Sequence, residues 1–342
     1  MNCSTSRRVA VFLGTLFCLC CAPLLAQTPF QFPTGNRALY QPGGELVFFA
    51  PTAPEKAWTS GSFGCVRDNG RRMHEGLDIR HLHTDRHGEP TDPVLATADG
   101  TVMYFSTKPG LSNYGNYVVL RHLVEGLEIY SLCAHLSEIR PGLKIGDAVK
   151  AGEVIGTMGR TSSAETIAKD RAHVHFELNV LINDNFAAWF KKNSTPEERN
   201  DHGEWNGQNL TGLDGREILL AEKSGNFNLL DFMRGQTELC RVLVRATNFP
   251  YLKRYAALVL KSPAAEKAGV AGYEIALNYN GVPFALMPRA ASEIKGSAKF
   301  QLLSVNEAVQ KANPCRKLVV KHGSHWQLTD KGVRELGLLT YQ

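Results

Sequence analysis

With 342 residues, 43% of them hydrophobic and 21% charged, the chain can bury a proper core, and its length predicts two domains. The formal net charge is +5, and it falls to +3 without Arg7 and Arg8 of the N-terminal segment. So mild a charge excludes nucleic acid as an expected partner and only modestly favours an anionic polymer or surface.

The N-terminal segment has the pattern of an export signal. Arg7 and Arg8 precede an apolar run from Val9 to Leu25, and Ala26 ends the run as a small residue. The run is short for a membrane span, and no later stretch is long and uncharged enough for one. We expect residues 1–26 to be removed and the protein to be exported, periplasmic or extracellular, without a transmembrane segment.

Four cysteines follow this segment: Cys65, Cys133, Cys240 and Cys315. None has the Cys-x-x-Cys spacing of a zinc knot or a redox motif. An even number in an exported protein is typical of disulfides, and four cysteines allow three connectivities. The spacing alone does not choose among them.

Strand signals dominate the N-terminal half. Residues 27–57 are predicted to be a lead-in with one strand at the apolar run Leu46–Ala50. A glycine-punctuated strand is predicted next, at Trp58–Arg67. Hairpins are predicted over Pro93–Phe105, around Asp99-Gly100, and over Tyr117–Leu136, around Glu125-Gly126. Helical periodicity is scarce, so this half is predicted to be mainly antiparallel β-sheet.

Apolar and polar residues alternate over Ala172–Leu178, which is the period of a β-strand. Residues two apart on a strand point to the same face, so His173 and His175 project side by side. Two such imidazoles can bind one metal, or one can bind it while the other reaches its water. They can equally be two surface histidines on an edge strand.

A second pair of candidate ligands is His74 and Asp78. Gly70 and Gly76 argue against a helix here, and a bent loop running into a strand at Leu77–Ile79 fits better. Such a bend lets an imidazole and a carboxylate converge on a small cation, a ligand set that suits zinc. The alternative is a turn histidine with an N-capping aspartate.

His135 ends an apolar strand in Ala134-His-Leu-Ser, where a lone histidine is either a satisfied core residue or a catalyst. The joint pattern is more informative. His-x-x-x-Asp, Ala-His-Leu-Ser and His-x-His-Phe-Glu follow one another in a single chain, each at a strand or its end.

This ordered set resembles the lysostaphin-type zinc endopeptidases, also called LytM-like or duplicated-hybrid-motif peptidases. The resemblance covers about Trp58 to Val180 and includes four connecting phrases. These are Gly70-Arg-Arg-Met-His-Glu-Gly-Leu-Asp-Ile, Ala98-Asp-Gly-Thr-Val, Tyr114-Gly-Asn-Tyr-Val-Val-Leu and Gly146-Asp-Ala-Val-Lys-Ala-Gly-Glu-Val-Ile-Gly. It implies an antiparallel β-sheet peptidase domain with a groove over residues 58–185.

Carried over by position, the resemblance implies that His74, Asp78 and His175 are ligands of one Zn²⁺, and that His135 and His173 are catalytic histidines beside its water. Such histidines can accept a proton, stabilise an oxyanion or supply the leaving amine. Glu177 is either a second-sphere acceptor for a ligand or a plain surface residue. The family's substrate is the peptide part of bacterial peptidoglycan, and crosslink cleavage is the expected activity.

Three departures from the family pattern stand out. Residues 80–92, with His81, His83 and His87, and residues 161–172 are longer than the family's links, and both are expected at the rim of the groove. The three histidines are read as solvated loop residues, with a second metal as the alternative. Cys65 and Cys133 replace common aromatic residues, and the hypothesis is that they form a disulfide beside the site, with a free buried thiol at each position as the alternative.

Beyond Phe186 the composition shifts, and residues 186–212 are predicted to be a linker. Residues 213–342 are predicted to form a small accessory α+β domain, with a possible Cys240–Cys315 disulfide. Strands are predicted at Arg241–Ala246, Tyr255–Leu260, Tyr273–Asn278 and Leu318–Lys321, and helices at Ser304–Ala312 and Thr329–Leu338. Its role is open among groove occlusion, wall binding and docking of a regulatory partner.

Two other classes of function compete with the hydrolase. Some members of the family lack ligands and act as non-catalytic activators of other wall hydrolases, but every expected ligand is present here. The phrase around Lys150 resembles the turn of biotinyl and lipoyl carrier domains, a reading that leaves the histidines unexplained.

Overall fold

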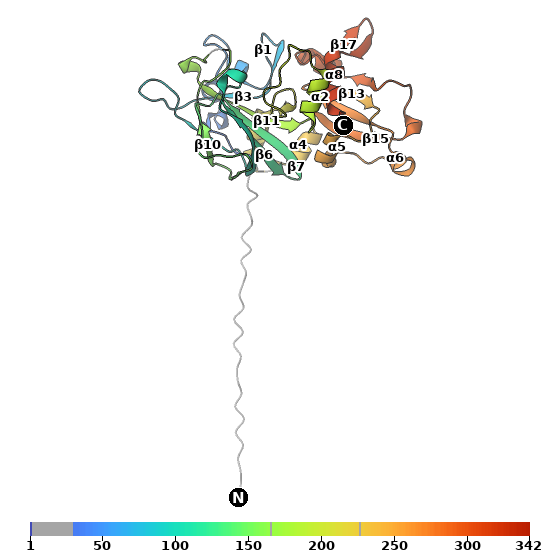
Figure 1. Cartoon of the computed structure of the whole chain (residues 1–342), viewed down its shortest axis with the longest axis horizontal. Coiled ribbons are helices and arrows are strands. Elements are labelled where there is room, and N and C mark those ends of the chain that lie inside the picture. Colours follow the sequence, from blue (N-terminus) through green and yellow to red (C-terminus); the bar gives the residue numbers. More distant parts are fainter. Residues whose placement is uncertain (2–29, 165, 226) are drawn as a thin grey trace.

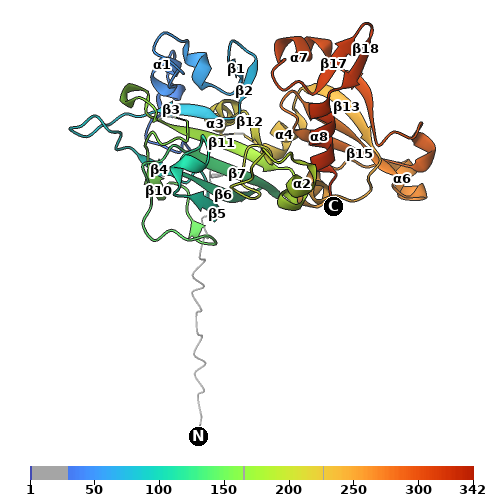
Figure 2. The same cartoon turned by 45° about the horizontal axis from the view of Figure 1, so that its top comes forward.

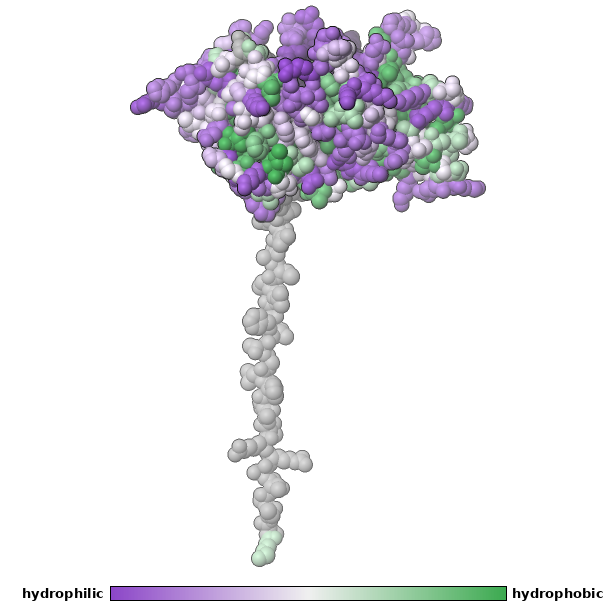
Figure 3. All heavy atoms as spheres, viewed as in Figure 1, coloured by the Kyte–Doolittle hydropathy of each residue, from purple (hydrophilic) through white to green (hydrophobic). Residues whose placement is uncertain are grey.

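The computed structural model describes residues 30–164, 166–225 and 227–342, together with Met1. The predicted export signal therefore lies outside the described residues, except for Met1. Two lobes stand side by side, the N-terminal lobe of residues 30–225 and the C-terminal lobe of residues 227–342 (Figure 1). Polar side chains dominate the face in Figure 3, where apolar ones gather in separate small patches. No helix in the described part of the chain is long and apolar enough to cross a membrane.

The N-terminal lobe is built on a seven-stranded antiparallel sheet. Six of its strands follow the order β12-β11-β7-β6-β5-β9, and the seventh, β3, pairs with β11. A three-stranded sheet, β4-β10-β8, and a two-stranded one, β1-β2, complete it. Its elements are η1 (Ala38–Tyr40), α1 (Glu45–Phe48), η2 (Trp58–Gly61), β1 (Gly64–Arg67), β2 (Arg72–His74), β3 (Leu77–Arg80), β4 (Pro93–Leu95), β5 (Gly100–Ser106), η3 (Pro109–Leu111), β6 (Tyr117–Val124), β7 (Leu127–Ala134), β8 (Glu138–Ile139), β9 (Ala148–Val149), β10 (Val154–Thr157), η4 (Lys169–Arg171), β11 (His173–Leu181), α2 (Phe186–Asn193), β12 (Leu210–Leu213) and α3 (Gly215–Glu222).

Strand β11 pairs with three other strands of this sheet, and all nine of its residues are buried. It pairs with β7 along one side, and on the other side with β3 at its start and β12 at its end. Val174, Phe176, Leu178 and Val180 alternate into the main hydrophobic core, as the period of a strand requires. The expectation of a mainly antiparallel β fold is confirmed.

Local turn signals were reliable only where the strands pair with their chain neighbours. The predicted β6–β7 hairpin is confirmed, and both of its turn residues have positive φ, 51° at Glu125 and 77° at Gly126. The predicted hairpin over Pro93–Phe105 is wrong, because β4 pairs with β10 while β5 pairs with β6 and β9. Asp99-Gly100 thus marks the passage between two sheets, where long-range pairing overrides the turn signal.

Two other strand predictions are wrong. The apolar run at Leu46–Ala50 lies partly in the short helix α1, and only Phe49 makes a bridge, to Ile79. Half of Tyr255–Leu260 lies in the short helix η5 (Ala256–Leu258), followed by a bridge at Val259. Each segment buries two large side chains in the core, Phe48 and Phe49 in the first and Tyr255 and Leu258 in the second, whereas Leu46 and Val47 are exposed.

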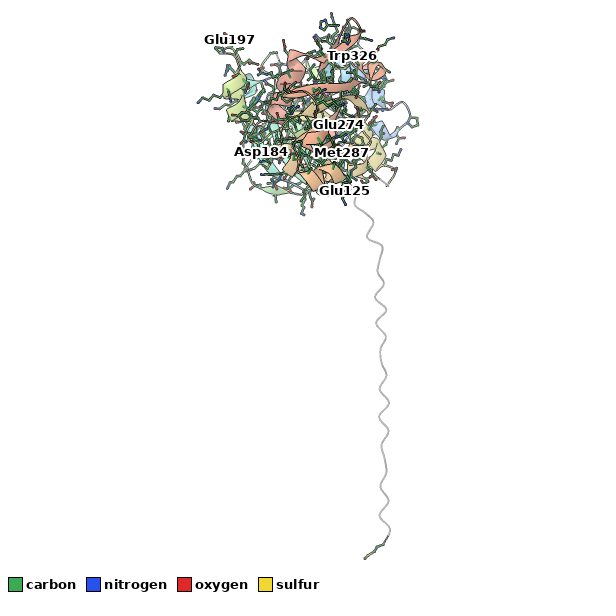
Figure 4. All side chains as sticks on the ribbon, turned by 90° about the vertical axis from the view of Figure 1, so that its right-hand side faces the viewer. Glu125, Asp184, Glu197, Glu274, Met287 and Trp326 are labelled. Carbon is green, nitrogen blue, oxygen red and sulfur yellow. A yellow bond between two sulfur atoms is a disulfide. The ribbon has the colours of Figure 1, made fainter. Side chains whose placement is uncertain are left out.

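The C-terminal lobe holds a four-stranded antiparallel sheet, β15-β14-β13-β16, and a hairpin, β17-β18. Figure 4 looks onto this lobe, with Glu274 and Met287 on neighbouring strands near the middle and Trp326 near the top. Its elements are α4 (Leu229–Arg234), β13 (Glu238–Val244), α5 (Pro250–Arg254), η5 (Ala256–Leu258), α6 (Pro263–Ala268), β14 (Gly272–Asn278), β15 (Pro283–Arg289), η6 (Ala291–Glu293), β16 (Phe300–Val305), α7 (Glu307–Ala312), β17 (Val319–His322), β18 (His325–Leu328) and α8 (Asp330–Leu339).

The boundary between the lobes is not an extended linker. Residues 186–212, predicted as the linker, contain helix α2 and most of β12, an edge strand of the large sheet. Helix α3, which falls within the predicted accessory domain, buries Ile218 and Leu219 in the same hydrophobic core as Phe176. One apolar cluster runs through both lobes, so they pack as a continuous unit.

The disulfide differs from both predicted pairs, Cys65–Cys133 and Cys240–Cys315. Cys65 in β1 is bonded to Cys315, with their Cα atoms 5.5 Å apart, and Cys133 and Cys240 are free and buried. The side chains of Cys133 and Cys240 belong to the hydrophobic core, where each serves as a small apolar residue. Burial raises the pKa of both thiols to about 12.

This connectivity predicts the thiol chemistry of the folded chain. Cys133 and Cys240 should not react with iodoacetamide in the native protein at pH 8, because they are buried and almost fully protonated. Both should react after unfolding without a reductant, and Cys65 and Cys315 only after reduction. Peptide mapping by mass spectrometry provides the measurement, and alkylation of Cys65 without a reductant would contradict the pairing.

Candidate metal centre and active site

The register of three strands brings the predicted residues together. His175 of β11 lies opposite Asp78 of β3 on one side and opposite Ala134 of β7 on the other. His135 follows Ala134 directly, and His173 lies two residues before His175, so both come to the same end of the sheet. The fifth residue, His74, is the last of β2.

Three donor atoms form a tight triangle. His74 Nε2 is 3.1 Å from Asp78 Oδ1 and 3.1 Å from His175 Nδ1, and the latter two atoms are 3.0 Å apart. Zinc–ligand distances of about 2.0–2.1 Å and tetrahedral angles place ligand atoms roughly 3.3 Å apart. Within the described residues this is the one group of three or more histidine, cysteine or carboxylate side chains that could hold a metal.

The hydrogen bonds of the four histidines fix where their ring protons lie. Nδ1–H donates to a backbone carbonyl in three of them, at 2.7–2.8 Å: in His74 to Ser62, in His135 to Thr161 and in His173 to Arg171. The Nε2 atom of these three rings is thus available as a ligand or a base, since these acceptors select the tautomer. In His175, Nε2–H donates to Glu177 Oε1 at 2.8 Å and Nδ1–H to Asp78 Oδ1 at 3.0 Å. Burial opposes the charge, but these two carboxylates raise the pKa of His175 to about 9, so a metal that binds at Nδ1 replaces a proton.

The charges around the triangle favour an ionised Asp78. Burial acts against ionisation, but the neighbouring imidazoles of His74 and His173 and the guanidinium of Arg67 hold the pKa of Asp78 well below its usual range. Arg67 pairs with Asp78 Oδ2, and its Nη2 lies 2.8 Å from His74 Nε2. The guanidinium therefore lies where the donor atoms converge, and a metal ion bound there would displace it from His74.

His135 and His173 lie beside the triangle, with their ring centroids 4.9 Å apart. His173 Nε2 is 3.5 Å from Asp78 Oδ1. Burial and the neighbouring His173 and His175 lower the pKa of His135 to about 3, so this imidazole is neutral at physiological pH. His135 also has a φ of 64°, a conformation that few residues other than glycine adopt and that is enriched at functional sites.

The five side chains lie in a groove of about 610 Å³, whose wall includes Ser162, Thr166 and Ala168 of the second insertion. The expectation of a rim position is thus confirmed for residues 161–172. The first insertion, residues 80–92, lines no part of the groove. It contacts the second insertion through Glu89, which forms an ion pair with Lys169 and another with Arg160, just before that insertion.

The histidines of the first insertion do not assemble into a second metal centre. His81 Nδ1 donates to the carbonyl of Ala172 at 2.8 Å. His83 Nδ1 lies 3.1 Å from Asp92 Oδ1, and a carboxylate oxygen of Asp92 also accepts the backbone N–H of His83. These contacts are those of an ordered surface loop.

Residues 72–187 match the model of peptidase family M23. This segment is an M23 peptidase domain. Solved structures similar to the chain include a zinc-containing peptidase from Vibrio cholerae, 29% identical over 31% of this chain and 26% of that one, with a TM-score of 0.24. The match thus spans about a quarter of that peptidase.

The catalytic domain of lysostaphin from Staphylococcus simulans is 28% identical over 34% of this chain and 74% of its own, with a TM-score of 0.24. A putative glycyl-glycine endopeptidase lytM from Ruminococcus gnavus is 21% identical over 44% of this chain and 48% of its own, with a TM-score of 0.29. No curated protein sequence matches the chain significantly.

Two residues in the groove, Arg67 and Tyr114, were not predicted from the sequence as parts of the site. Arg67 forms an ion pair with Asp78 across 11 positions of the chain. Tyr114 donates its hydroxyl proton to Glu177 Oε1 at 3.0 Å. Both contacts join residues of different strands or loops, so neither periodicity nor spacing could indicate them. Glu177, for which two readings were open, is 1% exposed and is the acceptor that orients His175.

The position of Glu177 leads to a prediction about metal binding. Glu177→Gln keeps the shape but removes the negative charge opposite His175 Nε2–H, so the imidazole becomes a poorer ligand. We expect zinc to bind the M23 domain about 10- to 100-fold more weakly, measured by competition with a chromogenic chelator. Equal affinity would show that the carboxylate does not support His175; Glu138→Gln, in the short strand β8 outside the groove, is the control.

Proposed function

We propose that the protein is an exported zinc metalloendopeptidase that hydrolyses peptide crosslinks of bacterial peptidoglycan. The observation that carries the proposal is the triangle of His74 Nε2, Asp78 Oδ1 and His175 Nδ1, with the proton-free nitrogens of His135 and His173 beside it. Three protein ligands with an open fourth position form the usual catalytic zinc site.

Each residue has a chemical role that follows from its contacts. A zinc ion held by the triangle would supply Lewis acidity at the scissile carbonyl and a water of lowered pKa. His135 is neutral and keeps a free ring nitrogen, so it can take a proton from that water. His173, also neutral in the free protein and adjacent to His135, is a second group that can carry a proton towards the leaving amine.

The groove suits an extended peptide that carries carboxylates. The acidic residues in its wall, Glu75, Asp78 and Glu177, are all engaged in ion pairs or hydrogen bonds. Arg72 and Arg171 also line it. Arg72 forms an ion pair with Asp68 that is exposed on both sides, 66% and 57%, so solvent weakens the pair and a substrate can compete for the guanidinium. These arginine side chains favour an anionic substrate such as a wall peptide with free carboxyl groups.

Export is part of the proposal. It is supported by the signal-like N-terminal sequence and by the Cys65–Cys315 disulfide, because disulfides persist in oxidising compartments. The alternative function is that of a purely regulatory zinc protein. The presence of both candidate catalytic histidines beside the three candidate ligands favours the hydrolase. Lys150, the residue that a carrier domain would modify, forms an ion pair with Asp99.

The test is hydrolysis of purified peptidoglycan. We expect the protein to release muropeptides with newly formed amino termini, and a chelator to abolish the release until zinc is restored. Mass spectrometry of the products identifies the bond. Release that continues at full rate in the chelator would refute the metal-dependent mechanism, whereas zinc binding without any release would favour the regulatory alternative.

A further inference from the structure

The hairpin that carries His74 is not hydrogen-bonded into any larger sheet. Strands β1 and β2, of four and three residues, pair only with each other and not with the large sheet. A two-stranded hairpin by itself is at best marginally stable in water. Yet β1 ends at Arg67 and β2 ends at His74, so the geometry of the triangle depends on where this hairpin is held.

The C-terminal lobe holds the hairpin at both strands. On β1, Cys65 is bonded to Cys315, and Gly64 lies against the hydroxyl of Tyr279, within 3.4 Å of the position a Cβ atom would take. Just before β1, the ring of Phe63 packs against Tyr279 at a centroid distance of 6.3 Å. Figure 2 shows the blue hairpin at the top of the N-terminal lobe, next to the red segments of the C-terminal lobe.

On β2 the contact is electrostatic and starts one residue after His74. Glu75 Oε1 accepts from Arg316 Nη1 at 2.9 Å, and Glu75 Oε2 accepts from Asn280 Nδ2 at 2.7 Å. The side chains of Glu75 and Arg316 are only 16% and 14% exposed, so solvent screens the pair weakly. Arg316 follows Cys315 directly, so adjacent residues of the C-terminal lobe hold both strands of the hairpin.

We propose that the C-terminal lobe is a positioning element of the metal centre, which sets the place of His74 through the Cys65–Cys315 disulfide and the Glu75–Arg316 pair. Glu75 and Arg316 are positioning residues, because they act through His74 and contribute no atom to the triangle of donor atoms. This inference rests on the metal site of the proposed function, and it assigns the lobe a role other than occluding the groove or binding the wall.

The experiment compares full-length variants. Arg316→Met removes the contact on β2, and the double variant Cys65→Ala/Cys315→Ala removes the covalent contact on β1. Arg289→Met is the matched control. Arg316 pairs with two carboxylates, Glu75 and Glu335. Arg289 likewise pairs with two, Glu274 and Glu293, but both lie within the C-terminal lobe. Zinc affinity, the visible spectrum of the Co²⁺-loaded protein and hydrogen exchange of the metal-free protein are measured for each.

We expect both test variants to bind zinc about 10- to 100-fold more weakly, as for losses of outer contacts at other metal sites. Backbone exchange should quicken at residues 64–75 and stay unchanged in the β6–β7 hairpin, which shows that the fold survives. The Co²⁺ bands should shift in both variants, the control should match wild type, and Arg316→Lys should restore part of the affinity.

Two outcomes separate this inference from the proposed function. If both variants keep wild-type zinc affinity and wild-type exchange at residues 64–75 while the wild-type protein hydrolyses its substrate, the positioning role is refuted and the proposed function stands. If the wild-type protein binds zinc and the variants lose affinity as expected, but no hydrolysis occurs, the positioning role stands and the proposed function fails.

Discussion

His175→Ala is expected to weaken metal binding strongly and to reduce hydrolysis even further. Structural zinc sites with four ligands bind with about 10–16 kcal/mol, so one ligand accounts for roughly 3–4 kcal/mol, or several hundred-fold in affinity. Hydrolysis should fall further, by about a thousand-fold or more, because the remaining pair, His74 and Asp78, cannot hold the metal in an open three-ligand geometry. Isothermal titration with zinc and a muropeptide release assay measure the two effects.

The matched control for this variant is His83→Ala. His83 is a histidine of the first insertion with a 72% exposed side chain, and it does not line the groove. Its removal should leave zinc affinity and hydrolysis at wild-type levels. Wild-type zinc affinity in folded His175→Ala would contradict the ligand assignment, and circular dichroism shows whether that variant is folded.

His135→Ala separates chemistry from metal binding. His135 contributes no atom to the triangle, so zinc affinity should stay within about threefold of wild type. The turnover rate should fall by about 10²- to 10⁴-fold, the usual contribution of a positioned acid or base. The same two measurements, zinc titration and muropeptide release, test this expectation.

The backbone at His135 calls for a second variant. Its φ of 64° is disfavoured for alanine, whereas asparagine tolerates this region well. His135→Asn therefore removes the imidazole with less risk to the local fold, and it should show the same loss of turnover with zinc retained. Turnover near the wild-type level in both variants would remove His135 from the mechanism.

The residues of the candidate site were predictable because their geometry is mostly local. The two-residue period of β11 alone places His173 and His175 on one face, and the bend before β3 brings His74 close to Asp78. Their meeting with His135 depends on strand register, which only the family resemblance could imply. The structure adds the reason, since His175 pairs with both Asp78 and Ala134.

Long-range contacts were not predictable. The disulfide between Cys65 and Cys315 spans 250 positions, and β12 joins the large sheet from within a segment whose composition resembles a linker. Loop closure over such distances leaves no trace in local periodicity. The same holds for Arg67 and Tyr114, whose partners lie on other strands.

Strand period and residue chemistry are properties of neighbouring positions, so the strand-rich class of the N-terminal lobe and the five candidate side chains could be inferred from the sequence. Which cysteines pair, that the second lobe holds the hairpin of His74 and that Arg67 lies among the candidate ligands became apparent from the folded chain alone. These depend on packing between segments far apart in the chain, where the burial of apolar surface, rather than any local preference, selects the neighbours.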